Sequence, residues 1–309
     1  MKTLSLPGIT VDASVVILGL MRSALLSDSE IRALVGTARD SGVTMFDHAD
    51  VYGSEAHGAE RRFGEAGAVP AAERDQVIIQ SKVGIREGYF DFSHDHILDA
   101  VDESLAALKT DYLDILLLHR PDALVEPDEV ASAFDTLHRA GKVRAFGVSN
   151  HTPGQIELLK RSVKQPLIVN QVQFSITHAA LVSQGIAANM SGLEQSVDRG
   201  NGILDYSRLH DITVQAWSPF QRQFFDGVFL GDTERYPELN SALDQIAEKY
   251  STTPTGVALA WILRHPAAMQ VVVGTTNPGR VVESAAGADT VLTREEWYLL
   301  FRAAGHTVP

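Results

Sequence analysis

Residues 44–52 have the sequence Thr44-Met45-Phe46-Asp47-His48-Ala49-Asp50-Val51-Tyr52, a short apolar run that ends at a charged residue and leads into a polar loop. Similar runs of apolar and β-branched residues recur along the whole chain, which is typical of strands buried in a parallel sheet. Eight strands are predicted on this basis, at residues 15–19, 44–47, 77–82, 115–119, 145–149, 169–173, 213–217 and 271–274.

Helical patterns lie between these strands. In residues 27–41 the apolar side chains recur with a helical period, and Ser27 with Glu30 has the pattern of a capping box. Further helices are predicted at residues 97–108, after Thr152-Pro153, after Asn277-Pro278, and at residues 294–304 behind a second capping box of Thr293 and Glu296. Alternating strands and helices predict an α/β (β/α)8 barrel, the TIM barrel, with a doubly wound open sheet as the alternative. Residues 4–6 and 9–11 are expected to form an N-terminal hairpin that closes the bottom of the barrel.

Composition limits the classes of partner. The 309 residues show no shift in composition, so one domain, residues 1–309, is predicted. A net charge of −13 argues against nucleic acid and an anionic membrane as partners, and favours a small molecule.

The absence of cysteine excludes disulfides, thiolate metal sites and a cysteine nucleophile. No apolar stretch has the length of a signal peptide or a membrane span, so a cytoplasmic protein is expected. The sequence favours neither a monomer nor an oligomer.

Two long loops, residues 175–202 and 220–237, interrupt the regular spacing. Long loops in compact domains are usually lids or binding loops. The second loop is rich in aromatic residues, which fit a surface mini-core and a cover over a cofactor or substrate equally well: Phe220, Phe224, Phe225, Phe229 and Tyr236.

Ionisable residues stand at the ends of three neighbouring strands. Asp47, Lys82 and His119 each end a predicted strand, and Tyr52 lies in the loop after Asp47. The carboxyl ends of barrel strands meet at one mouth, where barrel enzymes hold their active sites. A nearby Lys82 ammonium is expected to lower the pKa of the Tyr52 phenol, Asp47 to pair with Lys82, and His119 to orient a substrate oxygen. These residue types suit proton transfer to a carbonyl oxygen, and the electrons must come from a cofactor.

Other interpretations of the same residues stay open. Singly, each could be structural: an aspartate that caps a helix, a lysine along an apolar wall, a histidine bonded to a backbone carbonyl, a packed tyrosine. A metal-dependent hydrolase is suggested by His48 and Asp50, and by His94 and His96 in what is expected to be a loop before a helix. A nicotinamide-binding redox sensor with slow turnover, like a channel regulatory β-subunit, is a further alternative.

The motifs together resemble the aldo-keto reductases almost from end to end, and in particular the bacterial oxidoreductases related to potassium-channel β-subunits. The residues that carry this resemblance are Phe46-Asp47-His48-Ala49-Asp50-Val51-Tyr52-Gly53, Ser81-Lys82, Asp111-Tyr112-Leu113-Asp114, Leu118-His119-Arg120-Pro121-Asp122 and Gly147-Val148-Ser149-Asn150. No glycine-rich GxGxxG follows the first predicted strand, which counts against a Rossmann fold.

The resemblance implies an NADPH-dependent oxidoreductase that reduces aldehyde or ketone carbonyls. It implies a catalytic tetrad in which Tyr52 is the general acid, Lys82 lowers its pKa, Asp47 pairs with Lys82 and His119 positions the carbonyl. It implies no metal, a small carbonyl compound as substrate, and NADP(H) in preference to NAD(H). The cofactor residues that it implies are Gly19, Leu20, Met21, Asp47, Ser149, Asn150, Gln171, Trp217, Ser218, Pro219, Phe220, Gln221, Gly274, Thr275, Thr276, Arg280, Glu283 and Ser284.

Within that set, Ser149, Asn150 and Gln171 are expected to bind the carboxamide, and Trp217 to stack on the nicotinamide ring. Arg280 is expected to face the 2'-phosphate from the first turn of a helix, whose free N–H groups suit an anion. The chain departs from the family at three positions. Many family members have a lysine at the position of Gly274 and an asparagine at the position of Ser284. The position of Met21, which lines the substrate pocket, is often an aromatic residue in the family.

Overall fold

Eight parallel strands form a closed barrel in the computed structural model, which describes residues 1–223 and 226–309. The strands are β3 (Val16–Gly19), β4 (Met45–Asp47), β5 (Ile78–Val83), β8 (Leu113–Leu118), β9 (Val143–Ser149), β10 (Leu167–Gln173), β11 (Thr213–Trp217) and β12 (Met269–Val273). Strand β12 pairs with β3 and so closes the ring. The predicted (β/α)8 barrel is confirmed, and the open-sheet alternative is wrong because these eight strands leave no edge.

Each predicted strand is present, although several strand ends differ. Strand β8 starts at Leu113 and stops before His119, and β12 starts at Met269 and stops before Gly274. These ends are set by hydrogen-bonding neighbours, since Leu113 pairs with Val143 of β9. The sequence around Leu113 does not show which residue it will pair with.

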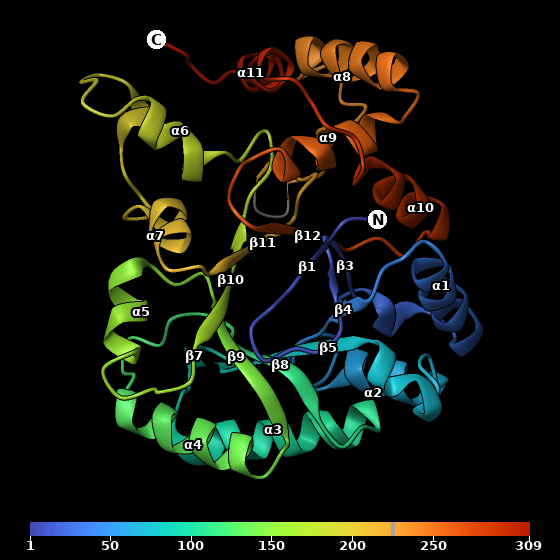
Figure 1. The fold of residues 1–309 in the computed structure, drawn as a ribbon, viewed down its shortest axis with the longest axis vertical. Coiled ribbons are helices and arrows are strands. Elements are labelled where there is room, and N and C mark those ends of the chain that lie inside the picture. Colours follow the sequence, from blue (N-terminus) through green and yellow to red (C-terminus); the bar gives the residue numbers. More distant parts are fainter. Residues whose placement is uncertain (224–225) are drawn as a thin grey trace.

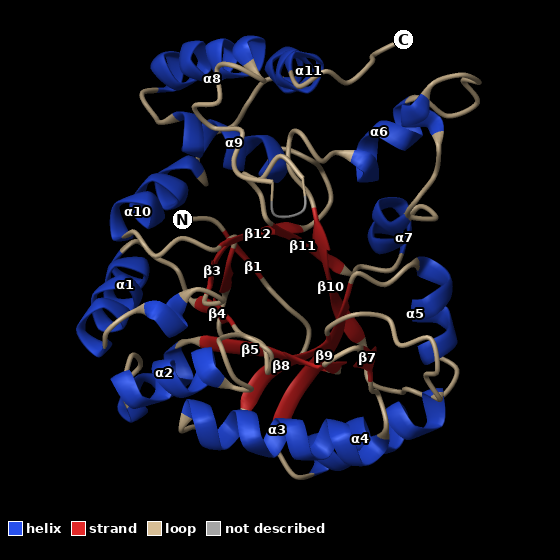
Figure 2. Ribbon diagram, turned by 180° about the vertical axis from the view of Figure 1, so that it is seen from behind, coloured by secondary structure: helices blue, strands red, loops and turns tan. Residues whose placement is uncertain are grey.

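A ring of helices surrounds the barrel, as Figures 1 and 2 show from opposite sides. The helices are α1 (Asp28–Asp40), α2 (Gly58–Ala66), α3 (His94–Leu108), α4 (Pro127–Arg139), α5 (Pro153–Leu159), α6 (Ala180–Ile186), α7 (Ile203–Leu209), α8 (Pro237–Tyr250), α9 (Pro254–Leu263), α10 (Pro278–Gly287) and α11 (Arg294–Ala303). The predicted capping boxes are present at Ser27, before α1, and at Thr293, before α11. Helix starts are local features, which is why the sequence predicts them well.

The N-terminal hairpin exists, but its second strand is not the predicted one. Strand β1 (Thr3–Leu4) pairs with β2 (Ala13–Ser14), and residues 9–11 form no strand. The chain turns at Gly8, where φ is 78°, and Ser14 is held by a hydrogen bond from its N–H to Thr44 Oγ1 at 2.9 Å. Leu6 is buried together with the inward-facing strand residues, so the segment fills the barrel bottom as expected.

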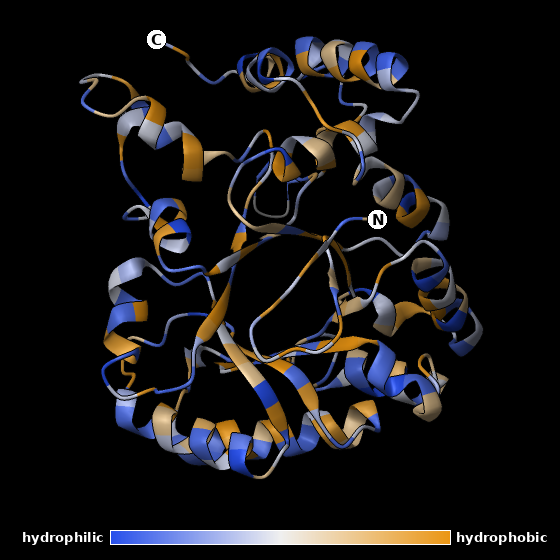
Figure 3. Ribbon diagram, in the orientation of Figure 1, coloured by the Kyte–Doolittle hydropathy of each residue, from blue (hydrophilic) through white to orange (hydrophobic). Residues whose placement is uncertain are grey.

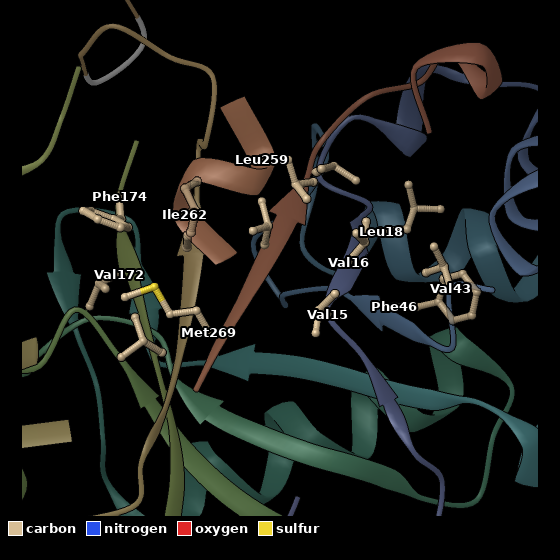
Figure 4. Close-up of a cluster of buried hydrophobic side chains, with 14 of the residues drawn as sticks. Val15, Val16, Leu18, Val43, Phe46, Val172, Phe174, Leu259, Ile262 and Met269 are labelled. Carbon is tan, nitrogen blue, oxygen red and sulfur yellow. The ribbon is translucent and has the colours of Figure 1, made fainter. Parts of the chain in front are cut away.

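The apolar core has two layers. The larger layer fills the space between the strands and the helices, and a smaller one lies inside the barrel. Figure 3 shows the strands as largely hydrophobic and the outer helix faces as largely hydrophilic. Figure 4 shows part of the larger layer, to which Phe174 after β10, Ile262 of α9 and Met269 of β12 belong.

The two long loops contain structure of their own. The first contains α6 and a short 3-10 helix, η3 (Glu194–Ser196). In the second, Phe229 is fully buried in the main core, with Phe220 and Tyr236 packed against that core. These three aromatic residues therefore support the packing interpretation, whereas Phe224 and Phe225 lie outside the described residues. Across the described parts of the chain, no helix combines the length and apolar character needed to span a membrane.

Candidate active site

The four ionisable residues predicted at strand ends come together at the mouth of the barrel. Lys82 is fully buried, and its Nζ donates to Asp47 Oδ2 at 2.7 Å and to the Tyr52 hydroxyl oxygen at 3.1 Å. The same Nζ donates to the His48 carbonyl at 2.8 Å, so the ammonium has three acceptors. The His119 ring stands edge-on to the Tyr52 ring, with 5.8 Å between centroids. The structure therefore holds a carboxylate, an ammonium, a phenol and an imidazole in contact.

The loop that carries Tyr52 is held by backbone hydrogen bonds. The Asp50 N–H donates to the Lys82 carbonyl at 3.0 Å, and the Ala59 N–H donates to the Tyr52 carbonyl at 2.7 Å. Gly53 has a φ of 119°, and a Cβ there would lie 3.1 Å from the Ala59 nitrogen. A side chain at this turn would be strained by the backbone conformation and crowded by the Ala59 nitrogen.

Burial and charge act in opposite directions on the two proton-handling groups. Burial raises the pKa of Tyr52, and the Lys82 ammonium only partly opposes this, so the phenol titrates above its usual value. Burial also disfavours the charge on Lys82, but Asp47 and Tyr52 outweigh it and raise the Lys82 pKa. The Lys82 ammonium therefore lowers the Tyr52 pKa as expected, but burial raises it by more, so the net shift is upward. Tyr52 keeps its proton at neutral pH, as a proton donor must.

His119 is a neutral imidazole. Its pKa lies well below the usual histidine value because burial, Lys82 and Arg120 all oppose a positive charge. Its Nδ1 is buried without a hydrogen-bond partner among the described residues. Since the ring is uncharged, one of its nitrogens carries a proton that can be donated to a ligand oxygen.

A chain of buried glutamines extends from Asp47 into the barrel. Gln80 Nε2 donates to Asp47 Oδ1 at 2.6 Å and to Gln215 Oε1 at 2.9 Å. Gln215 Nε2 donates to Gln270 Oε1 at 3.0 Å, and Gln270 Nε2 donates to the Ser14 carbonyl at 2.8 Å. This network was not predicted from the sequence. The sequence does show that glutamine interrupts three apolar strands. It does not show whether each glutamine side chain points into the barrel.

A second buried polar cluster lies behind the Tyr52 loop and was also missed. Glu60 is fully buried and is within hydrogen-bond distance of His57 Nδ1 at 2.6 Å and Ser104 Oγ at 3.0 Å. Burial and the charge of Glu60 raise the pKa of nearby Asp50 to about 7. Burial lowers the pKa of His48 to about 4. The motif that suggested a metal site therefore belongs to a buried structural cluster.

Convergent metal ligands are absent from the described residues, in which no group of three or more His, Asp or Glu side chains could hold an ion. His94 and His96 do not lie in a loop as predicted, since α3 begins at His94 behind the N-cap Ser93. The His94 ring contacts the adjacent Asp95, and the His96 ring contacts Arg86 at 2.8 Å. The two rings thus have separate partners.

The residues expected to bind the carboxamide lie side by side at the ends of β9, β10 and β11. Ser149 Oγ donates to the Gln171 carbonyl at 2.8 Å, and Trp217 Nε1 donates to Asn150 Oδ1 at 3.1 Å. Gln171 Nε2 donates to Asp47 Oδ1 at 2.9 Å and to Gln215 Oε1 at 3.0 Å. Both amide hydrogens of Gln171 are therefore engaged within the protein, and its side-chain oxygen is the atom left for a ligand.

The residues expected to bind the adenosine half follow β12. Arg280 is exposed in the first turn of α10, whose N-cap Asn277 accepts a hydrogen bond from Gly279 N at 2.8 Å. Ser284 is buried and its hydroxyl donates to the Arg280 carbonyl at 2.8 Å, whereas Glu283 is half-buried. The remaining residues predicted to bind the cofactor lie at or directly after the ends of β3, β11 and β12 and so surround the same mouth: Gly19, Leu20, Met21, Ser218, Pro219, Phe220, Gln221, Gly274, Thr275 and Thr276. These cofactor roles stay predictions.

A closed (β/α)8 barrel with this tetrad at its mouth defines an oxidoreductase of a known class. Residues 15–301 match the model of the aldo/keto reductase family, so the chain belongs to that family. The resemblance inferred from the sequence motifs is thereby confirmed.

Individual relatives are similar over most of their length. Oxidoreductase YdhF of Escherichia coli (strain K12) is 35% identical over 295 residues, which cover 92% of this chain and 91% of that protein. The 6-dehydroglucose reductase of Novosphingobium aromaticivorans is 33% identical over 284 residues, which cover 89% and 86%. The crystal structure of an aldo-keto reductase from Klebsiella pneumoniae in complex with NADPH superposes with a TM-score of 0.74 at 25% identity, covering 97% of this chain and 94% of that one.

Proposed function

We propose that this oxidoreductase reduces aldehyde or ketone carbonyls with NADPH, that residues 1–309 act as one domain, and that Tyr52 protonates the carbonyl oxygen. One observation carries the proposal. The buried Lys82 Nζ joins the Asp47 carboxylate, at 2.7 Å, to the Tyr52 hydroxyl, at 3.1 Å. An ammonium in contact with a phenol stabilises the negative charge that remains when the proton leaves.

The chemistry follows from the protonation states. Tyr52 is protonated because burial raises its pKa, and it gives this proton to the carbonyl oxygen of a small substrate. Lys82 stabilises the phenolate that forms, and Asp47 holds the ammonium in place. The neutral His119 donates a second hydrogen bond to the same oxygen and fixes its position. Bound NADPH supplies the hydride, which no side chain of the chain can provide.

The residues at the mouth fit a nicotinamide dinucleotide. Ser149, Asn150 and Gln171 are residue types that bind a carboxamide, with the side-chain oxygen of Gln171 left to accept a hydrogen bond from it, and Trp217 offers a ring for stacking. Arg280 lies exposed in the first turn of α10, where a cation and free N–H groups suit a phosphate. The NADPH bound by the Klebsiella pneumoniae relative supports the same cofactor.

Replacing Tyr52 with phenylalanine tests the proton donor. We expect Tyr52→Phe to lower kcat for aldehyde reduction about 1,000-fold, within the range attributed to general acid catalysis, while NADPH binding measured by fluorescence stays unchanged. Tyr112→Phe is the control, because the Tyr112 hydroxyl contacts the backbone of Arg74, away from the tetrad. Retained turnover in Tyr52→Phe would overturn the assignment. Negligible wild-type turnover with tight NADPH binding would favour the redox sensor.

Replacing Arg280 with alanine tests the choice of NADPH over NADH. We expect Arg280→Ala to weaken NADPH binding about tenfold or more, as loss of a hydrogen bond to a charged group does, and to leave NADH nearly unaffected. Arg294→Ala removes a similarly exposed arginine from the first turn of α11 and serves as the control. Equal losses for the two cofactors would show that Arg280 does not contact the 2'-phosphate.

A further inference from the structure

Arg120 is unusual among the arginines of this chain. Most of the half-buried arginines of the described residues pair with a carboxylate: Arg39, Arg62, Arg74, Arg144 and Arg222. Arg264, also half-buried, donates to the Leu292 carbonyl at 2.7 Å. Arg120 is half-buried as well, yet no ion pair or hydrogen bond of its guanidinium is found within residues 1–223 and 226–309.

The guanidinium of Arg120 lies at the mouth of the barrel. Its Cζ is 5.7 Å from the centre of the Trp217 ring, and Arg120 directly follows His119 in the chain. Burial lowers its pKa, which the neighbouring Tyr52 partly opposes, but an arginine stays charged throughout the physiological range. A cation–π contact over Trp217 uses the face of the guanidinium and leaves its five N–H donors free.

Carboxylates near this position are already engaged. Asp47 accepts hydrogen bonds from Lys82, Gln80 and Gln171. Asp122, two residues after Arg120, accepts from the Phe92 N–H at 3.1 Å and from the Leu124 N–H at 2.8 Å. A charge partly withdrawn from water without a partner is unfavourable, which favours an anion supplied from outside.

We propose that Arg120 recognises an anionic group of the substrate, and that the substrates are carbonyl compounds that also carry a carboxylate or a phosphate. The proposal rests on the reductase function proposed above. The planar fork of arginine matches both groups with two parallel hydrogen bonds. The charges of Arg120 and Tyr52 interact, so the anion should lie near the carbonyl that Tyr52 protonates. In a chain of net charge −13, this cation gives the mouth a local preference for anions.

The test compares charged aldehydes with uncharged ones of similar size. Steady-state NADPH oxidation is measured with 4-oxobutanoate against 4-oxobutanamide, and with glyceraldehyde 3-phosphate against glyceraldehyde. We expect kcat/KM of the wild type to favour one or both anionic substrates by about tenfold or more. Whichever pair shows the larger ratio distinguishes a carboxylate from a phosphate.

Arg120→Met removes the charge while keeping much of the side-chain length. We expect it to lower kcat/KM for the preferred anionic substrate about 10- to 100-fold, as loss of a charged hydrogen-bonding partner does, and to change the uncharged substrates and the NADPH dissociation constant less than about threefold. Arg120→Lys keeps the charge but loses the fork, and should fall between the two. Arg39→Met is the matched control, because Arg39 is half-buried but pairs with Glu73.

Three results would overturn the proposal: no preference for anions in the wild type, equal losses on charged and uncharged substrates, or a loss of NADPH affinity that accounts for the whole effect. The last result would assign Arg120 to the cofactor. A calorimetric titration of the NADP+ complex with 4-hydroxybutanoate and glycerol 3-phosphate keeps the test independent of turnover. Binding that Arg120→Met abolishes would support the anion site even if no carbonyl were reduced, and absence of binding to the wild type would count against it.

Discussion

Gln80 is a side chain whose role is visible only in the folded protein, and its replacement by methionine gives a sharp prediction. Gln80 Nε2 donates to Asp47 Oδ1 at 2.6 Å and to Gln215 Oε1 at 2.9 Å, and Gln215 Nε2 donates back to Gln80 Oε1 at 3.1 Å. Methionine is similar in length and flexible, but it cannot donate a hydrogen bond. Gln80→Met therefore removes these contacts with little change in volume.

The expected loss of stability follows from the contacts removed. A hydrogen bond to a charged group contributes about 1.5–3 kcal/mol and a neutral one about 1 kcal/mol. The apolar methionine offsets a part of this, so we expect the free energy of unfolding to fall by about 3 kcal/mol. Without the hydrogen bond from Gln80, the negative charge of Asp47 is more fully available to the Lys82 ammonium, and the carboxylate is held less firmly. We therefore expect kcat to fall about tenfold and the basic limb of its pH profile to move upward, because Lys82 stabilises the Tyr52 phenolate less.

The control is Gln270→Met. Gln270 accepts from Gln215 at 3.0 Å and donates to the Ser14 carbonyl at 2.8 Å, but it does not contact Asp47. Urea denaturation followed by circular dichroism should show a loss of stability in both variants, smaller in Gln270→Met because Gln270 makes no hydrogen bond to a charged group, whereas only Gln80→Met should change kcat and the pH profile. If both variants lose kcat equally, or if Gln80→Met keeps the wild-type profile, the reasoning is refuted and the network only stabilises the fold.

Two further predictions concern stability. Burial and Glu60 raise the pKa of Asp50 to about 7, so between about pH 4 and pH 7 the folded state binds a proton that the unfolded state lacks, and stability falls as pH rises. Asp50→Asn should raise the melting temperature more at pH 8 than at pH 5; equal changes at the two pH values would contradict this. A Cβ on Gly287 would lie 2.3 Å from the Gly256 Cα, whereas one on Gly36 meets nothing within 4 Å. Gly287→Ala should cost about 2 kcal/mol in urea denaturation and Gly36→Ala should gain about 0.5–1 kcal/mol; a neutral Gly287→Ala would show that α9 and α10 can separate.

Most of the barrel could be predicted from the sequence because its signals are local. The capping box at Ser27 and the N-cap at Asn277 act within one helical turn, and the structure has both helices. The strand pattern predicted eight strands, but strand ends such as Leu113 depend on the neighbour Val143. The N-terminal hairpin was misplaced for the same reason, since its pairing of Thr3 with Ser14 spans residues that the local pattern does not connect.

The sequence by itself determined which side chains would meet at the mouth. A parallel barrel brings the carboxyl ends of its strands together, so residues that end strands, such as Asp47 and Lys82, become neighbours whatever the details of packing. The direction of their pKa shifts was decided by the tertiary structure, because burial of Tyr52 outweighs the charge of Lys82. Tertiary structure also decided which glutamines point inward to contact Asp47 and which half-buried arginine forms no ion pair or hydrogen bond within residues 1–223 and 226–309. Such contacts join residues far apart in the chain, and their energies depend on how completely the folded protein removes each group from water.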